Sequence, residues 1–213
     1  MMHHGPGNIR TAKSGPSFFL GPLTQPPPRT LFGVDKHGVE LSLHAASPGD
    51  IDLFLELSNN PKLNRFESLV DISREFLSDA LTHVQQCFEN TQTRRALWKW
   101  AIKNGQGSPV GGIELSALPL DHVLFHQALM IGFTVLPDSQ RNGYASGAMK
   151  SMIDWIRKTG LVSEIQGWCH KDNAASQHTM LKLGMKKTLH TVDQYFPRLN
   201  EVSPMEVWSA ALV

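Results

Sequence analysis

The sequence lacks most features that mark specialised protein classes. Only two of its 213 residues are cysteines, Cys87 and Cys169, too few for a disulfide-stabilised scaffold, so we expect a reducing, cytoplasmic location. No apolar run approaches the roughly 18 residues that span a bilayer, and no membrane association is expected. The formal net charge of +1 argues against a dedicated nucleic-acid binder. What remains is an ordinary globular chain, 41% hydrophobic, of about one domain.

The start of the chain differs in composition from the rest. No acidic residue precedes Asp35, and residues 1–28 hold ten of the thirty Gly and Pro residues. Such a stretch cannot bury much apolar surface, and proline removes backbone donors. We predict a flexible leader over residues 1–30 and one folded domain over residues 31–213. An organelle transit peptide, which is also poor in acidic residues, is a less favoured alternative.

Hydrophobic periodicity divides the folded part into strands and helices. The expected strands cover residues 39–44, 96–103, 110–115, 128–136, 161–168, 185–196 and 205–212. The expected helices open near Ser47, near Asp71 or Ser73, at Tyr144, and near Asp172 or Asn173. Phe76 falls on the inward face of the second helix, and Pro204 falls in the loop before the last strand. This order predicts an α+β fold with a mixed sheet, not a doubly wound one.

The segment after the strand at 128–136 has the composition of an anion site. The strand stops at Pro137, a short polar loop follows, and a helix begins near Gly143. Backbone N–H groups at a helix start lack partners and carry partial positive charge. Gly143 and Ala145 would let a phosphate approach the backbone closely. Alone, the segment fits an anion cradle or an ordinary strand-to-helix turn about equally well, and it matches neither a Walker loop nor a dinucleotide fingerprint.

A second motif pair follows. Asn173-Ala174-Ala175-Ser176 opens a short helix and Lys182-Leu183-Gly184-Met185 closes it; alone, Asn173 and Gly184 fit helix caps. In this order the segments resemble the GNAT superfamily of acyl-CoA-dependent N-acetyltransferases, and within it the RimJ/RimL-like branch. Gln140-Arg141-Asn142-Gly143-Tyr144-Ala145 fits the family pattern Gln/Arg-x-x-Gly-x-Gly/Ala, and the later motifs stand for the branch's Asn-x-x-Ser and Lys-Leu-Gly-Phe. The resemblance covers residues 39–212.

The resemblance implies a GNAT-like fold, a mixed, mostly antiparallel, twisted sheet flanked by helices, with splayed central parallel strands. The pantetheine arm of acetyl-CoA would lie between those strands, and the loop amides would hold its pyrophosphate. Close approach of CoA would also explain Gly147, where the branch usually carries Glu. The residues expected to bind acetyl-CoA, a co-substrate, are Phe133, Thr134, Val135, Gln140, Arg141, Asn142, Gly143, Tyr144, Ala145, Asn173 and Ser176; no metal is expected.

The chemistry that the resemblance implies is direct acyl transfer. A neutral amine attacks the thioester, a base takes the amine proton, and an acid protonates the departing thiolate. The family's usual acid, a Tyr four residues before the motif glycine, is replaced here by Met180, which supplies no proton. Ser176 is therefore the candidate acid; the alternative is a helix hydroxyl that only bonds the backbone.

The base is less determined by the sequence. Glu114, on a strand near the expected cleft, is the first candidate, and a solvent-facing strand residue is the alternative. His122 and His126 precede the central strand and more often would be surface or turn residues. Glu67 lies in the loop where this branch builds its acceptor wall.

Together these features predict an N-acetyltransferase that moves an acetyl group to a primary amine. The acceptor would be a small molecule or a protein N-terminus, and the enzyme would be a monomer or a homodimer. The alternative is a catalytically degenerate CoA-binding or protein-interaction module, because Met180 replaces the usual acid. Under both interpretations, Gly143→Trp should block the anion cradle.

Overall fold

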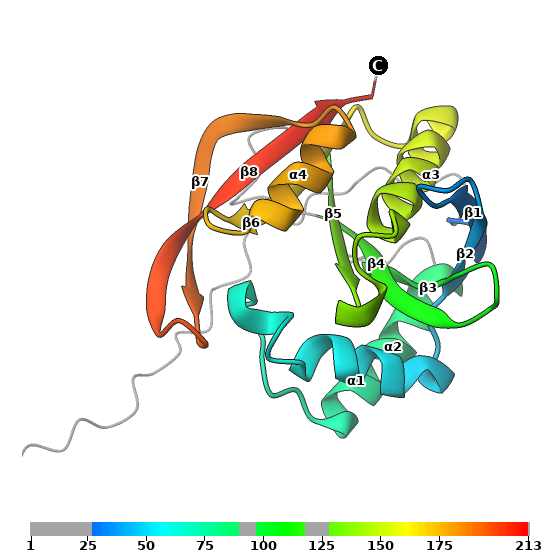
Figure 1. The fold of residues 1–213 in the computed structure, drawn as a ribbon, viewed down its shortest axis with the longest axis horizontal. Coiled ribbons are helices and arrows are strands. Elements are labelled where there is room, and N and C mark those ends of the chain that lie inside the picture. Colours follow the sequence, from blue (N-terminus) through cyan, green and yellow to red (C-terminus); the bar gives the residue numbers. More distant parts are fainter. Residues whose placement is uncertain (1–26, 90–96, 118–127, 213) are drawn as a thin grey trace, which may run out of the picture.

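The computed structural model describes residues 27–89, 97–117 and 128–212 (Figure 1). Within them, eight strands form one sheet in the order β1-β2-β3-β4-β5-β6-β8-β7. The strands are β1 (Thr30–Val34), β2 (Glu40–Ala45), β3 (Leu97–Lys103), β4 (Pro109–Ala117), β5 (Ala128–Val135), β6 (Glu164–His170), β7 (Lys186–Phe196) and β8 (Glu201–Ala211). The helices are α1 (Ile51–Asn59), α2 (Arg74–Glu89), α3 (Tyr144–Thr159) and α4 (Ala174–Lys182), with short 3-10 turns η1 (Pro48–Asp50), η2 (Asn64–Phe66) and η4 (Pro137–Ser139).

The sheet is mostly antiparallel and separates at its one parallel pair. Strands β4 and β5 pair over their whole overlap, from Gly111 opposite Val135 to Ala117 opposite Leu129. In contrast, β5 and β6 pair only over residues 128–130, which lie opposite residues 164–166. Beyond these residues the two strands part. The predicted mixed sheet with a splayed parallel pair is therefore confirmed.

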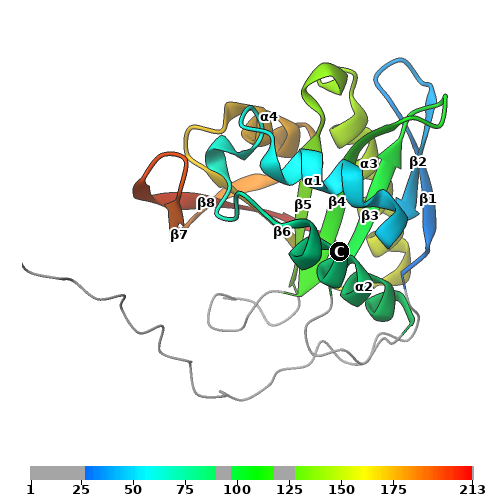
Figure 2. The ribbon, with the colours of Figure 1, turned by 90° about the horizontal axis from the view of Figure 1, so that it is seen from below.

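The helices cover both faces of the larger half of the sheet. Helices α1 and α2 pack on one face of β3–β5, and α3 packs on the other (Figure 2). The core between these layers contains the fully buried Trp98 and Trp100, as well as Cys87 from α2. No helix among residues 27–89, 97–117 and 128–212 is long and apolar enough to cross a membrane.

The first strand, β1, was not predicted from the sequence, where the first expected strand begins at residue 39. Its outward residues Phe32 and Val34 are 60% and 54% exposed, while its inward residues are Leu31 and Gly33. A side chain at Gly33 would meet the backbone of Gly147 in α3, so Leu31 is the one large apolar residue on the inner face of β1. The packed chain begins before β1, since the Pro28 carbonyl accepts a hydrogen bond of 3.0 Å from Trp100 Nε1.

Two local predictions were wrong. Phe76 is 56% exposed rather than inward, because the buried face of α2 is formed by other residues of that helix, Leu77, Leu81, Val84, Cys87 and Phe88. Pro204 lies within β8, not in the loop before it. It is just outside the β6–β8 ladder, which ends at Met205, and strands tolerate proline at such positions.

Candidate active site

The loop between β5 and α3 exposes backbone amides at the point where the sheet opens. Gly143 is the N-cap of α3, with a φ of 87°, and the first helical hydrogen bond runs from Gly147 N to Gly143 O. The amides of residues 144–146 therefore have no helical acceptor, and no other described group accepts from them. With the partial positive charge of the helix start, these amides can hold an anionic group.

Side chains of the loop fix its shape. Gln140 Nε2 donates to the Val135 carbonyl at 3.2 Å, and Asn142 Nδ2 donates to the Ser139 carbonyl at 3.2 Å. Arg141 has a φ of 65°, a left-handed conformation that costs energy for a non-glycine residue. The neighbouring turn between β1 and β2 supports it, because Lys36 N donates to Asn142 O at 3.1 Å and Lys36 Nζ to Arg141 O at 2.5 Å.

The two glycines of this region serve packing inside the protein. A Cβ at Gly143 would lie 2.6 Å from Lys36 N, and its left-handed φ already disfavours a side chain. A Cβ at Gly147 would overlap the Val34 carbonyl of β1. Gly147 thus lets α3 approach the sheet edge, a different reason from the close approach of CoA that we expected. Gly143→Trp would disrupt the loop itself, so it does not test a ligand site.

Helix α4 presents Asn173 and Ser176 on the other side of the opening. Asn173 caps the helix, since its Oδ1 accepts from Ser176 N at 3.2 Å, which leaves its Nδ2 as the donor for a ligand. Ser176 is half-buried, and its Oγ makes no hydrogen bond in the described part of the chain. Other helix hydroxyls do bond back to carbonyls, for example Thr179 Oγ1 to Ala175 O at 2.9 Å. The Ser176 hydroxyl is therefore available to a ligand.

Met180 is part of the packing between α4 and β6. It is 1% exposed, and a Cβ at Gly167 of β6 would lie only 2.6 Å from its Sδ. The sulfur fills the space that the missing side chain of Gly167 leaves. No acid can come from this position.

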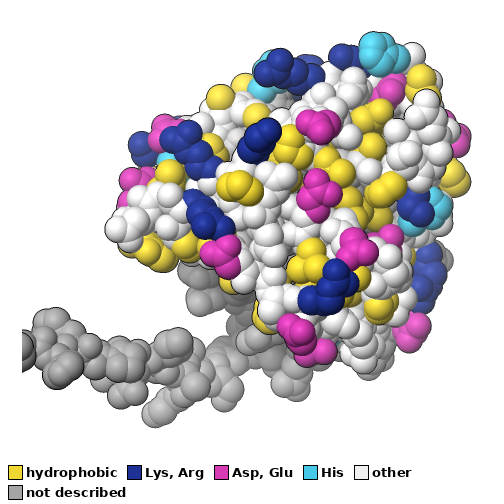
Figure 3. Space-filling model, turned by 60° about the horizontal axis from the view of Figure 1, so that its bottom comes forward, with side chains coloured by type: hydrophobic (Ala, Val, Ile, Leu, Met, Phe, Trp, Pro, Cys, Tyr) yellow, Lys and Arg dark blue, Asp and Glu magenta, His cyan; other side chains and the backbone are white. Residues whose placement is uncertain are grey.

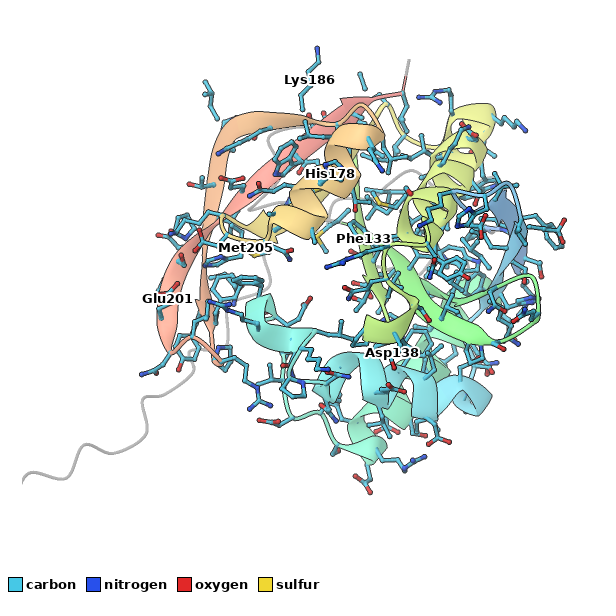
Figure 4. All side chains as sticks on the ribbon, viewed as in Figure 1. Phe133, Asp138, His178, Lys186, Glu201 and Met205 are labelled. Carbon is cyan, nitrogen blue, oxygen red and sulfur yellow. The ribbon has the colours of Figure 1, made fainter. Side chains whose placement is uncertain are left out.

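Glu114 lies over the strand that leads to the opening. The strand register aligns Lys99 of β3, Glu114 of β4 and Gly132 of β5. Lys99 Nζ is 2.8 Å from Glu114 Oε2, and a Cβ at Gly132 would lie 3.0 Å from Glu114 Cγ. Figure 4 shows the next residue, Phe133, at the centre of the molecule, between α4 and β4. Glu114, 31% exposed in its side chain, is thus a half-buried, ion-paired residue next to β5.

Glu67 joins this group from the loop between α1 and α2. The residue as a whole is exposed, while nearby protein atoms partly desolvate its carboxyl group. This desolvation, and next the charge of Glu114, raise the pKa of Glu67 from 4.5 to about 7, while Lys99 opposes the shift. From the sequence, Glu67 was expected only in the acceptor wall. Nothing in the linear pattern shows its proximity to Glu114, which comes from a different element.

Other candidates are less supported. His122 and His126 lie outside the described residues. Tyr195 is 48% exposed, and its hydroxyl donates to Asn200 Oδ1 at 3.0 Å within the β7–β8 hairpin. The described residues contain no group of His, Cys, Asp and Glu side chains that could hold a metal ion.

Comparisons with known proteins identify the family. The family model described as "Acetyltransferase (GNAT) domain" matches residues 40–186. The uncharacterized N-acetyltransferase YoaA of Bacillus subtilis (strain 168) is 24% identical over 148 residues, which cover 69% of this chain and 80% of YoaA. A second N-acetyltransferase of that organism, YjdG, is 27% identical over 107 residues, or 50% of this chain and 61% of YjdG.

Solved structures of similar fold include proteins with bound CoA. Mycobacterium smegmatis RimJ in complex with CoA-disulfide has a TM-score of 0.71 at 13% identity, covering 88% of this chain and 90% of that one. Spermidine N-acetyltransferase from Vibrio cholerae, with CoA and spermine, has a TM-score of 0.66 at 16% identity, covering 81% and 95%. By the family match and the fold together, this chain belongs to the GNAT family of N-acetyltransferases.

Proposed function

We propose that this protein transfers an acetyl group from acetyl-CoA to a primary amine by direct attack on the thioester. One observation carries the proposal. Strand β5 separates from β6 after residue 130 and leads into a loop, and the backbone amides that follow this loop, at residues 144–146, have no hydrogen-bond acceptor among the described residues. An unpaired strand edge and an anion cradle thus lie on one continuous segment. The pantetheine arm and the pyrophosphate of CoA need such neighbouring sites.

The residues on both sides of the opening fit this ligand. The amides of residues 141–145 would hold the pyrophosphate, and the backbone of residues 133–135 would pair with the amide groups of the arm. Asn173 would donate its free Nδ2 to the arm from α4. Gln140 and Asn142 would act by holding the loop in shape. Acetyl-CoA supplies the activated acyl group, so positioning accounts for much of the rate.

Direct transfer is favoured over a cysteine-bound acyl group. Both cysteines of the chain are buried, Cys87 completely and Cys169 at 4% exposure. Burial raises the pKa of the Cys169 thiol to about 11, and the thiol form is a poor nucleophile. The amine itself is thus the attacking group.

The proton steps are assigned to Ser176, Glu67 and Glu114. Ser176 Oγ would protonate the departing thiolate. Glu67 would take the proton from the amine, directly or through a water molecule, because a carboxyl with a pKa near neutrality both accepts and releases protons readily. Glu114, engaged by Lys99 at 2.8 Å, would supply the negative charge that strengthens proton binding at Glu67. The proposal thus moves the base from Glu114, the first candidate from the sequence, to Glu67.

The acceptor is proposed to be a monocation, a small primary amine or a protein N-terminus. When Glu67 is ionised, two carboxylates and one ammonium group give the cluster a charge of −1, which matches one amine rather than a polyamine. On the face shown in Figure 3, acidic and basic side chains of the described residues are interspersed, without a broad acidic area. One structural neighbour is described as modifying the N-terminal serine of ribosomal protein L7/L12.

The test has two steps. Acetyl-CoA at about 1 mM should raise the unfolding temperature, since a ligand at a hundred times its dissociation constant stabilises by about 2.7 kcal/mol. Thiol release should then be measured with peptides bearing free N-termini and with small amines. Binding without thiol release from any amine would support the non-catalytic module instead. No binding would contradict both interpretations.

A further inference from the structure

The loop that carries Glu67 is attached to the opposite half of the sheet. Phe66, the residue before Glu67, stacks on His170 at the end of β6, with ring centroids 4.7 Å apart and an interplanar angle of 17°. His170 in turn meets Phe196 at the end of β7 edge-on, at 4.8 Å. The three rings form a column that joins the α1–α2 loop to β6 and β7, across the line where β5 and β6 part.

His170 is held in one orientation by polar contacts. It is fully buried, and its Nδ1 accepts a hydrogen bond of 3.1 Å from the backbone N of Asp172. Since Nδ1 is an acceptor, the ring proton of the neutral form lies on Nε2, which faces Glu201 Oε1 at 3.4 Å. Figure 4 shows Glu201 on the β7–β8 hairpin. The ring on which Phe66 stacks therefore cannot rotate without losing these contacts.

A second link closes the same loop on its other side. Asp71, in a left-handed conformation with φ 55°, forms an ion pair with Arg198 in the turn between β7 and β8. Between the two links the chain runs only from Phe66 to Asp71, and Glu67 lies in it. On the α1 side the segment is also fixed, since Asn59 Nδ2 donates to Ile72 O at 2.9 Å.

We propose that His170 and Arg198 are positioning residues for acetyl transfer: through Phe66 and Asp71 they hold Glu67 beside Glu114 and Lys99. We call the contacts Phe66–His170–Phe196 and Asp71–Arg198 the brace. The proposal rests on the assignment of Glu67 as proton acceptor. The physical basis of the proposal is that β5 and β6 diverge beyond residue 130. Side-chain contacts, rather than strand pairing, therefore join the loop that carries Glu67 to the half of the sheet that contains β6 and β7.

The brace makes the environment of Glu67 depend on distant residues. Glu114 and Lys99 face Glu67 from the sheet, and the Arg65 guanidinium lies 5.1 Å from the Phe66 ring centroid. Loosening either link should admit water around the Glu67 carboxyl and increase its distance from Glu114. Both changes lower its pKa toward 4.5 and weaken it as a base.

The test uses Phe66→Leu, which removes the stack but keeps apolar volume, and Arg198→Gln, which removes the ion pair at an exposed residue. Arg157→Gln, which removes an exposed ion pair with Asp154 on α3, is the matched control. The titration of the Glu67 carboxyl would be followed by carbon NMR in each full-length protein, with Glu67→Gln to assign the signal. Steady-state rates would be measured from pH 5 to 9.

The brace predicts a downward shift of the Glu67 titration in Phe66→Leu and Arg198→Gln, and none in Arg157→Gln. The acid limb of the profile of kcat against pH should move down together with the Glu67 titration. The value of kcat should fall about tenfold, which is less than the full contribution of a general base because Glu67 is still present. The dissociation constant of acetyl-CoA should stay unchanged. An unchanged Glu67 titration in both variants would overturn the brace.

The outcomes separate the brace from the proposed function. If Glu67→Gln loses activity while both brace variants behave as wild type, Glu67 is the base and the brace is wrong. If Glu67→Gln keeps wild-type turnover, the assignment of Glu67 as the base is wrong, and the positioning role of His170 and Arg198 is wrong as well. A shifted titration would then describe only the structure around Glu67.

Discussion

The two loops of the proposed active site are held in different ways. The donor loop, residues 136–145, is held by its own side chains, through Gln140 to Val135 and Asn142 to Ser139, and by Lys36 of the β1–β2 turn in the same half of the sheet. The acceptor loop, residues 60–73, carries Glu67 and is tied to the other half of the sheet, through His170 of β6 and Arg198 of the β7–β8 turn. The contacts of the donor loop thus stay within one half of the sheet, whereas those of the acceptor loop join both halves.

The largest effect should come from a charge placed in the donor loop. Ala145→Glu puts a carboxylate in the first turn of α3, where a negative charge favours the helix itself. It should nevertheless repel the pyrophosphate and raise the dissociation constant of acetyl-CoA by about a hundredfold, since like charges a few ångströms apart cost a few kcal/mol. Calorimetric titration measures this.

Ala145→Gln is the control of similar size without charge. It should bind acetyl-CoA at least ten times more tightly than Ala145→Glu. Equal affinity of the two variants and the wild type would move the phosphate site away from this loop.

The next largest effect tests the acceptor loop alone. Glu67→Gln should lower kcat by about a thousandfold, within the range of general-base catalysis, and leave acetyl-CoA binding unchanged. In the wild type, kcat should fall as the pH drops below about 7, because Glu67 must be ionised to accept the proton. A kcat profile that keeps this limb in Glu67→Gln would assign it to another group.

The same variant, although it lowers kcat, should raise the stability of the folded protein at high pH. The raised pKa means that the folded protein binds this proton more tightly than the unfolded chain, so stability from Glu67 is complete below pH 4.5 and is lost as the pH rises through about 7. The difference in unfolding temperature between Glu67→Gln and the wild type should therefore be more positive at pH 8 than at pH 5. Thermal unfolding at the two pH values checks this, and the difference should be small because the residue is exposed to water.

Ser176→Ala should lower kcat by about a hundredfold, at the lower end for acid–base catalysis because a thiolate is a good leaving group. Thr179→Ala is the matched control, because its hydroxyl lies in the same helix but bonds to the Ala175 carbonyl. Single-turnover thiol release separates this step from product release. Equal rates in both variants would remove Ser176 from the chemistry.

The smallest effect should come from the support of the donor loop. Lys36→Met removes the hydrogen bond to the Arg141 carbonyl and a positive charge next to the loop, and should weaken acetyl-CoA binding about fivefold, or about 1 kcal/mol. Lys158→Met, an exposed lysine at the far end of α3, should change nothing. If Lys36→Met binds like wild type, the donor loop needs no help from outside its own segment.

The same contrast explains what could be predicted from the sequence. The donor loop, Asn173 and Ser176 lie in contiguous motifs whose spacing alone places them at helix starts, and the helices and inner strands followed from periodicity. Strand β1 did not, because Gly33 faces α3 while Phe32 faces out. The relation of Glu67 to Glu114, and of His170 to Phe66, arises only when separate elements pack. A single sequence holds no signal for such contacts.

The contact between Lys36 and the donor loop links ligand binding to the edge of the sheet. Strand β1 is an outer strand, with Phe32 and Val34 exposed on an edge that another chain could pair with. Its turn bonds to Asn142, so a ligand that stabilises the loop should also make the opening of this hairpin less favourable. Amide hydrogen exchange in β1 should therefore slow when acetyl-CoA binds, and the co-substrate would protect the protein against edge-to-edge association.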